Sequence, residues 1–151
     1  MVKVLVASRN QGKVRELEQV LRELNIEGVE LVSLHDAPPY PDPVEDGLTF
    51  VDNALLKARA GAKATGLPCV ADDSGLSVKA LNGMPGILSA RWSGNHGDDQ
   101  ANNDLLLAQM ADINERAAAF VSCCALAAPD GQEFTAEGRC CLLYTSLMAR
   151  G

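Results

Sequence analysis

The polar segment from Ser8 to Lys13, which reads S-R-N-Q-G-K, stands between a short apolar run and a helical repeat. Unpaired N–H groups and the helix dipole attract anions at a helix N-terminus, so this loop could cradle a phosphate. The P-loop pattern fails at two positions, because Ala7 stands where its first glycine belongs and Val14 where its hydroxyl belongs. A polar turn followed by a helix-starting lysine explains the same residues, so both interpretations stay open at this point.

Two adjacent carboxylates, Asp72 and Asp73, follow a short apolar run. In an extended chain their side chains would point to opposite faces and would have different tasks. Mg²⁺ typically takes one or two protein carboxylates together with waters and substrate phosphates, so one of them with Glu45 or Asp46 could form a site. A turn or helix-capping segment is the alternative for an Asp-Asp-Ser-Gly run.

The remaining polar residues of interest have simpler explanations. Lys57 falls about 120° from Val51 on a predicted helix, away from the apolar stripe, where it could meet a ligand or water. His35 and His96 have no partner at metal-pair spacing, and we expect both at the surface. The cysteines include no C-x-x-C pair, so we expect reduced structural thiols without a zinc site or a disulfide framework. They are Cys69, Cys123, Cys124, Cys140 and Cys141.

The composition of the 151-residue chain is that of an ordinary globular domain, with 47% hydrophobic and 22% charged residues. A net charge of −7 gives no general attraction to nucleic-acid polymers or anionic membranes, so a phosphate ligand needs a local basic pocket. The apolar runs are shorter than the roughly 20 residues of a membrane span, and no signal-peptide pattern opens the sequence. We therefore expect a cytoplasmic protein without a membrane or nucleic-acid partner.

Strand and helix patterns alternate through the first half, and a hairpin pattern follows in the second. Thr49 and Asp52 resemble a capping box at the start of the clearest helix. This alternation predicts one α/β domain with a mixed β-sheet flanked by helices, not two domains. The expected elements are strands at Lys3–Ala7, Val29–Leu34, Cys69–Ala71, Leu76–Leu81, Ala118–Ala128 and Glu133–Ala136, helices from Lys13, from Thr49 and around Leu105–Ile113, and loops at Pro38–Pro43 and Gly83–Gly97.

Four segments resemble, in this order and at these separations, the motifs of the inosine/xanthosine triphosphate pyrophosphatase family. They are S-R-N-Q-G-K-V-R-E-L-E, E-D-G-L-T-F-V-D-N-A-L-L-K-A-R, V-A-D-D-S-G-L and G-M-P-G-I-L-S-A-R-W-S-G, within a match that runs from Met1 to about Arg139. The resemblance implies that family's α/β fold. It also implies hydrolysis of inosine, deoxyinosine and xanthosine triphosphates to the monophosphate and pyrophosphate, by a homodimer.

The same resemblance implies roles for individual residues. Glu45 and Asp73 would bind Mg²⁺, and Asp73 would also accept a proton, while Asp72 would support the site or reach the metal through water. In the family's pocket loop, Gly83–Gly94, further contributors would be Ser89, Arg91 and Ser93. The residues expected to bind the substrate are Ser8, Arg9, Asn10, Gln11, Gly12, Lys13, Lys57 and Ser74.

The resemblance stops near Arg139. Residues 140–151 match nothing in the family at that point, and the Phe-Gly-Tyr-Asp-Pro and Ser-His-Arg motifs that contact the base are not in this chain. We therefore expect a pyrophosphatase domain over residues 1–139, incomplete at its C-terminus, and a non-native tail over residues 140–151. The preference among the three triphosphates does not follow from the sequence.

Three rival functions remain to be weighed. The first is a nucleotide-binding fragment without catalysis, and the second is a Maf-like, septum-inhibitor type of nucleotide pyrophosphatase with a similar fold. The segments Glu45–Phe50 and Asp72–Leu76 weigh against the Maf-like interpretation. The third, a P-loop kinase, is disfavoured by the two broken positions of the phosphate-loop pattern.

Overall fold

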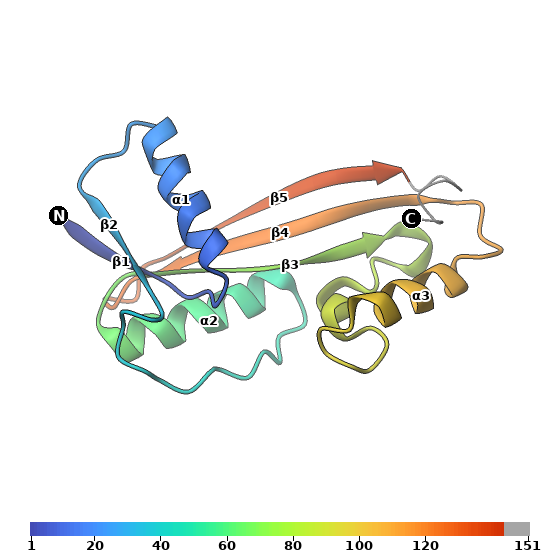
Figure 1. The fold of residues 1–151 in the computed structure, drawn as a ribbon, viewed down its shortest axis with the longest axis horizontal. Helices are drawn as coiled ribbons and strands as arrows, with labels where there is room; N and C mark the ends of the chain where they lie inside the picture. Colours follow the sequence, from blue (N-terminus) through green and yellow to red (C-terminus); the bar gives the residue numbers. More distant parts are fainter. Residues whose placement is uncertain (144–151) are drawn as a thin grey trace. The chain divides into compact units, whose positions relative to one another are not determined.

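The computed structural model describes residues 1–143, so residues 144–151 of the predicted tail lie outside the described residues. Its strands form one sheet in the order β2-β1-β3-β4-β5 (Figure 1). In chain order the elements are β1 (Val2–Val6), α1 (Gln11–Glu23), β2 (Val29–Ser33), α2 (Phe50–Thr65), β3 (Cys69–Val78), two 3-10 helices (Lys79–Leu81 and Gly86–Arg91), α3 (Asp99–Gln109), β4 (Ala117–Ala127) and β5 (Glu133–Leu143).

The first compact unit comprises residues 1–72 and 123–136. In it β1 pairs in parallel with β2, from Val2 opposite Val29, and with β3, where Leu5 lies opposite Cys69. The turn after β4 reverses the chain, with Ala128 N donating to Gln132 O at 2.8 Å. Parallel strands joined to an antiparallel hairpin confirm the predicted mixed α/β sheet.

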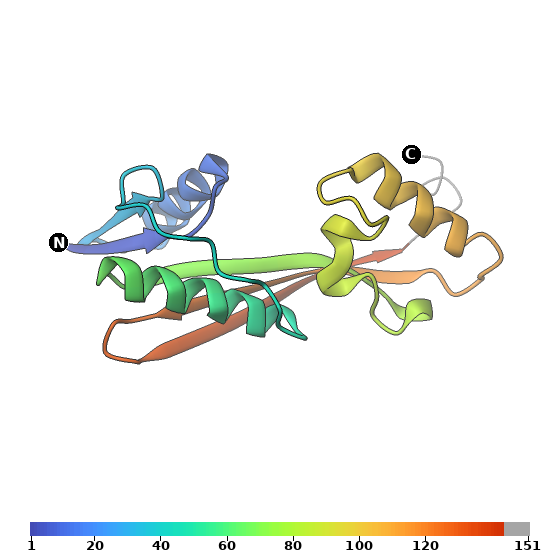
Figure 2. The same cartoon turned by 90° about the horizontal axis from the view of Figure 1, so that it is seen from below.

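The core of this unit forms where α2 packs on the sheet, along the first part of β3 (Figure 2). Apart from Asn53, the buried residues of α2 are alanines and Gly61, whose small size lets the helix approach the strands closely. The residues of the core are Leu5, Ala54, Ala58, Ala62, Cys69, Ala71, Ala125 and Ala127. This packing holds α2 fixed against the strand end that carries Asp72.

The second compact unit comprises residues 73–122 and the chain from Glu137 on. Its core gathers Val78, Leu106, Met110 and Ala118. Within it Ser89 is a structural residue, because its hydroxyl accepts from Leu76 N at 2.9 Å and donates to Gly86 O at 2.6 Å. β3, β4 and β5 each continue from one unit into the other.

Several predicted boundaries differ from the observed elements. The Asp-Asp-Ser-Gly run is not a turn, since β3 passes through it without a break to Val78, and Lys79–Leu81 is a 3-10 helix rather than strand. The predicted loop after Gly83 contains a 3-10 helix, and β5 extends beyond Ala136. Thr49 is the N-cap of α2 as predicted, since its side chain accepts from Asp52 N.

Within residues 1–143, no helix combines the length and apolar character that crossing a bilayer requires.

All five cysteines lie within the described residues and none is in a disulfide, as predicted. Burial raises the pKa of the Cys69 thiol from 9.0 to about 12, whereas Cys140 and Cys141 are exposed. At pH 8 we expect iodoacetamide to label the exposed pair much faster than Cys69, because the thiolate is the reacting form and Cys69 is buried and almost fully protonated. Peptide mass spectrometry gives the rates, and equal rates in the native protein would contradict the buried position.

The same shift has a consequence for stability. An unfolded Cys69 would ionise near its ordinary pKa of 9.0, while the folded thiol stays neutral to about pH 12. Between these values the unfolded state binds fewer protons, so the contribution of Cys69 to stability is full below pH 9.0 and is lost as the pH rises toward 12.

Candidate functional site

The predicted phosphate loop lies at the N-terminus of α1, which begins two residues earlier than expected, at Gln11. Asn10 is the N-cap, and its side-chain oxygen accepts from Gly12 N at 2.9 Å, while Ser8 Oγ accepts from Asn10 N at 3.1 Å. The first turn carries Lys13 and no acidic residue. The positive end of the helix dipole and the positive charge of Lys13 therefore lie together, which favours an anion there.

Lys13 forms an ion pair with Asp72 across 59 residues of sequence. α1 carries the lysine, and the end of β3 within the first unit carries the aspartate. Both side chains are partly buried, with 35% of Lys13 and 23% of Asp72 exposed. The structure thus brings the phosphate loop and the first of the adjacent carboxylates together.

A second ion pair joins Lys57 of α2 to Glu45 of the preceding loop, with Nζ 2.9 Å from Oε1. Only 23% of the Lys57 side chain is exposed, so a simple solvated position on the helix is wrong for this residue. The loop is fixed nearby, because Gly47 N donates to the buried Asn53 Oδ1 at 2.8 Å. Glu45, a predicted metal ligand, and Lys57, a predicted phosphate contact, are therefore joined in one ion pair.

Asp73 and Ser74 follow in β3 as the first residues of the second unit, and both are partly buried. Because β3 is continuous, the side chains of Asp72 and Asp73 point to opposite faces of the strand, as predicted for an extended chain. Further along, Ser93 N donates to Asn102 Oδ1 at 2.8 Å, and its buried hydroxyl has no hydrogen-bond partner among the described residues. Arg91 is exposed.

The carboxylates described above suit Mg²⁺ if phosphates and waters complete its coordination. Among residues 1–143 no group of three or more Asp, Glu, His or Cys side chains gathers, so an all-protein metal cage is not formed there. Mg²⁺ needs only one or two carboxylates when phosphates and waters complete its octahedron. Glu45, whose side chain is 42% exposed and whose carboxylate is paired with the ammonium group of Lys57, fits that requirement.

Two features near the phosphate loop did not follow from the sequence. Arg9 forms an ion pair with Asp42 of the proline-rich loop; this hydrogen bond lowers the pKa of Asp42 and raises that of Arg9. Burial, followed by the charge of Asp72, raises the pKa of Cys124 of β4, while the charge of Lys13 opposes this shift. Both links join residues far apart in sequence, so no local pattern signals them.

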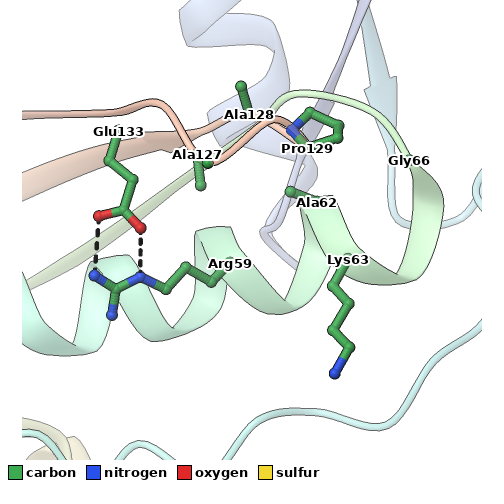
Figure 3. Close-up of a pocket in the computed structure, with 9 residues that line it drawn as sticks. Arg59, Ala62, Lys63, Gly66, Ala127, Ala128, Pro129 and Glu133 are labelled. Carbon is green, nitrogen blue, oxygen red and sulfur yellow. Dashed lines mark hydrogen bonds and ion pairs between the residues drawn. The ribbon is translucent and has the colours of Figure 1, made fainter.

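A cavity of about 460 Å³ lies at the C-terminal part of α2 (Figure 3). It is lined by Arg59, Lys63 and Gly66 of this segment and by the turn after β4. Arg59 donates to both carboxylate oxygens of Glu133, at 2.6 and 2.9 Å. None of the predicted site residues lines this cavity, so we regard its ion pair as structural.

Comparison with known sequences gives relatives that share most of the chain. A dITP/XTP pyrophosphatase of Corynebacterium efficiens is 66% identical over 140 residues, which are 91% of this chain and 68% of the relative. One from Mycobacteroides abscessus is 62% identical over the same shares of both chains.

Solved structures agree with this similarity. The crystal structure of a nucleoside-triphosphatase/dITP/XTP pyrophosphatase from Mycobacterium abscessus has a TM-score of 0.84 at 61% identity, covering 93% of this chain and 72% of that one. The Staphylococcus aureus Ham1 protein has a TM-score of 0.85 at 35% identity, covering 95% and 72%. The Ham1 family itself matches residues 4–141, which include the phosphate loop, both lysine–carboxylate pairs and Asp73. With fold, motif order and sequence in agreement over nearly its whole length, the chain belongs to the Ham1 family.

Proposed function

We propose that this chain hydrolyses inosine, deoxyinosine and xanthosine triphosphates to the monophosphate and pyrophosphate, and so removes non-standard purines from the nucleotide pool. The proposal is supported most by relatives of 66% and 62% identity that bear the name dITP/XTP pyrophosphatase. The positive start of α1, with Lys13 beside it, is the kind of site that a triphosphate requires.

The residues divide into those that hold the phosphates and those that act on the water. Ser8, the segment Asn10–Lys13, Lys57 and Ser74 bind the triphosphate, and the lysines offset its charge. Mg²⁺ held by Glu45 and Asp73 would withdraw charge from the phosphate oxygens. Asp73 orients the attacking water and accepts its proton.

In the reaction the water oxygen forms a bond to the α-phosphorus while the bond from that phosphorus to its bridging oxygen breaks. Pyrophosphate then leaves with the bridging oxygen. Positioning and charge neutralisation supply most of the catalysis in phosphoryl chemistry, so fixed lysines and carboxylates on rigid elements suit it. α2 and β3, packed together through alanines, provide such elements.

The compartment, the oligomeric state, the metal and the class of ligand are inferred in the same way. We infer a cytoplasmic homodimer that uses Mg²⁺ and binds a small nucleotide rather than a nucleic-acid polymer or a membrane. The resemblance to the family supports the dimer and the metal, and the acidic net charge of −7 supports the absence of polymer binding. Residues 140–151 stay a proposed non-native tail, although the family match extends to residue 141.

A nucleotide panel tests the proposal. We expect the protein to release pyrophosphate, and not orthophosphate, from dITP and XTP, and we expect chelation of Mg²⁺ to abolish that release. Separate enzymatic assays for the two products distinguish the outcomes, with dATP and dGTP as comparison substrates. Orthophosphate as the product would contradict the proposal, and tight nucleotide binding without turnover would favour a non-catalytic binding fragment.

A further inference from the structure

The loop between β2 and α2, residues 34–49, carries Glu45 and is tied to the phosphate loop by the Arg9–Asp42 ion pair. Asp42 stands between Pro41 and Pro43, whose rings restrict the backbone on both sides of it. The backbone that carries the Asp42 carboxylate is therefore restricted in its conformation. The pair itself is exposed, with 79% of the Arg9 side chain and 63% of the Asp42 side chain open to solvent.

This loop has anchors on either side of Asp42. Tyr40 packs against the core of the first unit, where its hydroxyl comes close to α2 at Gly61. At the other end, Gly47 is held by Asn53, and Glu45 by Lys57. Asp42 thus lies between two segments that α2 holds, while its own contact is with the loop that precedes α1.

Packing alone does not fix this middle segment. Arg9, Tyr40 and Asp42 line a cavity of about 280 Å³, whose other walls include Leu34 and Pro38. A segment that borders a cavity has few atoms beneath it to resist movement. The ion pair therefore joins the two loops beside a cavity that Leu34 and Tyr40, which pack against the core, also line.

We propose that Arg9 and Asp42 form a clasp that holds the Glu45-bearing loop in place beside the phosphate loop, so that Arg9 is a positioning residue rather than a phosphate contact. This inference rests on the proposed function for its effect on activity. The guanidinium of Arg9 has a carboxylate partner in the neighbouring loop. Contact of Arg9 with the substrate, expected from the sequence, is the alternative that the experiments below distinguish from the clasp. Exposed ion pairs contribute little to global stability, so the clasp acts on local geometry.

The clasp is tested with Arg9→Gln, Asp42→Asn, their combination, and the charge-swapped Arg9→Asp/Asp42→Arg protein. Each single variant should raise the Mg²⁺ concentration for half-maximal pyrophosphate release by about two- to fivefold, the scale that loss of an exposed ion pair can produce. The combination should be no worse than either single variant, because both remove the same contact. The charge swap should restore most of the Mg²⁺ response.

Glu133→Gln is the matched control. It breaks the Arg59–Glu133 pair, which is also an exposed arginine–carboxylate contact of the first unit and contains none of the predicted site residues (Figure 3). We expect its Mg²⁺ response to equal that of the wild type. A similar loss in this control would mean that removing any surface ion pair has the effect, and the clasp would be rejected.

A second readout needs neither metal nor nucleotide. Amide hydrogen exchange over residues 44–48 should be faster in Arg9→Gln and Asp42→Asn than in the wild type, and unchanged in Glu133→Gln. If Arg9→Gln raises the KM for dITP while Asp42→Asn leaves the KM and the Mg²⁺ response unchanged, Arg9 contacts the triphosphate and the clasp is overturned. If the wild type releases no pyrophosphate, the proposed function fails, whereas the exchange data still decide whether the clasp exists.

Discussion

Asp73→Asn is expected to lower kcat for pyrophosphate release by about 10²–10⁴-fold, the range for loss of a positioned general base. The amide has nearly the same shape as the carboxylate, but it cannot take the proton from water and is a poorer ligand for Mg²⁺. Nucleotide affinity should change much less, since the loop before α1 and the lysines remain. Rapid-quench turnover and equilibrium binding of dITP measure the two quantities separately.

Asp72→Asn is the control for this variant, because it makes the same chemical change at the neighbouring residue. Asp72 pairs with Lys13 and points to the other face of β3, so its loss should alter the KM more than kcat. Turnover of Asp73→Asn within a factor of about three of the wild type, well short of the loss expected for a general base, would remove Asp73 from the catalytic role. Equal losses in both variants would show that the residues act together rather than separately.

Gly61→Ala is expected to destabilise the protein by about 2 kcal/mol, although alanine is favoured over glycine in a helix by about 1 kcal/mol. A Cβ at this position would overlap Cys69 Sγ and would lie 3.0 Å from Leu5 Cδ2 and 3.1 Å from the Tyr40 hydroxyl. Leu5 and Cys69 are fully buried, so neither can move aside freely. Urea unfolding of the variant gives the change in the free energy of unfolding.

The double variant Gly61→Ala/Cys69→Ala checks the cause of this loss. Removing the sulfur makes room for the new methyl group, so the double variant should be more stable than the sum of the two single changes predicts. Gly138→Ala is a suitable control, because a Cβ there would meet nothing within 4 Å. A more stable Gly61→Ala protein would mean that α2 does not approach the sheet as closely as described.

The sequence predicted the first strand, the capped helix α2 and the mixed α/β class because these depend on local periodicity and capping. The start of α1 was placed too late, because the capping contact of Asn10 with Gly12 N is a side-chain detail within a polar run. Asp72 lies in a strand rather than a turn for a reason that local pattern does not contain. β3 is hydrogen-bonded between β1 and β4, which are distant from it in the sequence.

The same limit applies to the candidate site. The resemblance to the family supplied its residues, and the structure adds the pairing of Lys57 with Glu45. The contact of Arg9 with Asp42 spans 33 residues, and neither the residue types nor their spacing in the sequence marks the two as partners. Long-range ion pairs depend on how the chain returns on itself, which short sequence windows do not encode.

The two lysine–carboxylate pairs have a consequence for how ligands enter. Without ligand, Lys13 is paired with Asp72 and Lys57 with Glu45, so the charge within each of these two pairs is balanced. A cation that takes Glu45 alone breaks its ion pair with Lys57, and a polyphosphate that takes Lys13 alone breaks its ion pair with Asp72. When the cation and the polyphosphate both bind, each lysine and each carboxylate of the two ion pairs exchanges one partner for another. Thermodynamic linkage then requires the cation and the nucleotide to raise each other's affinity by the same factor.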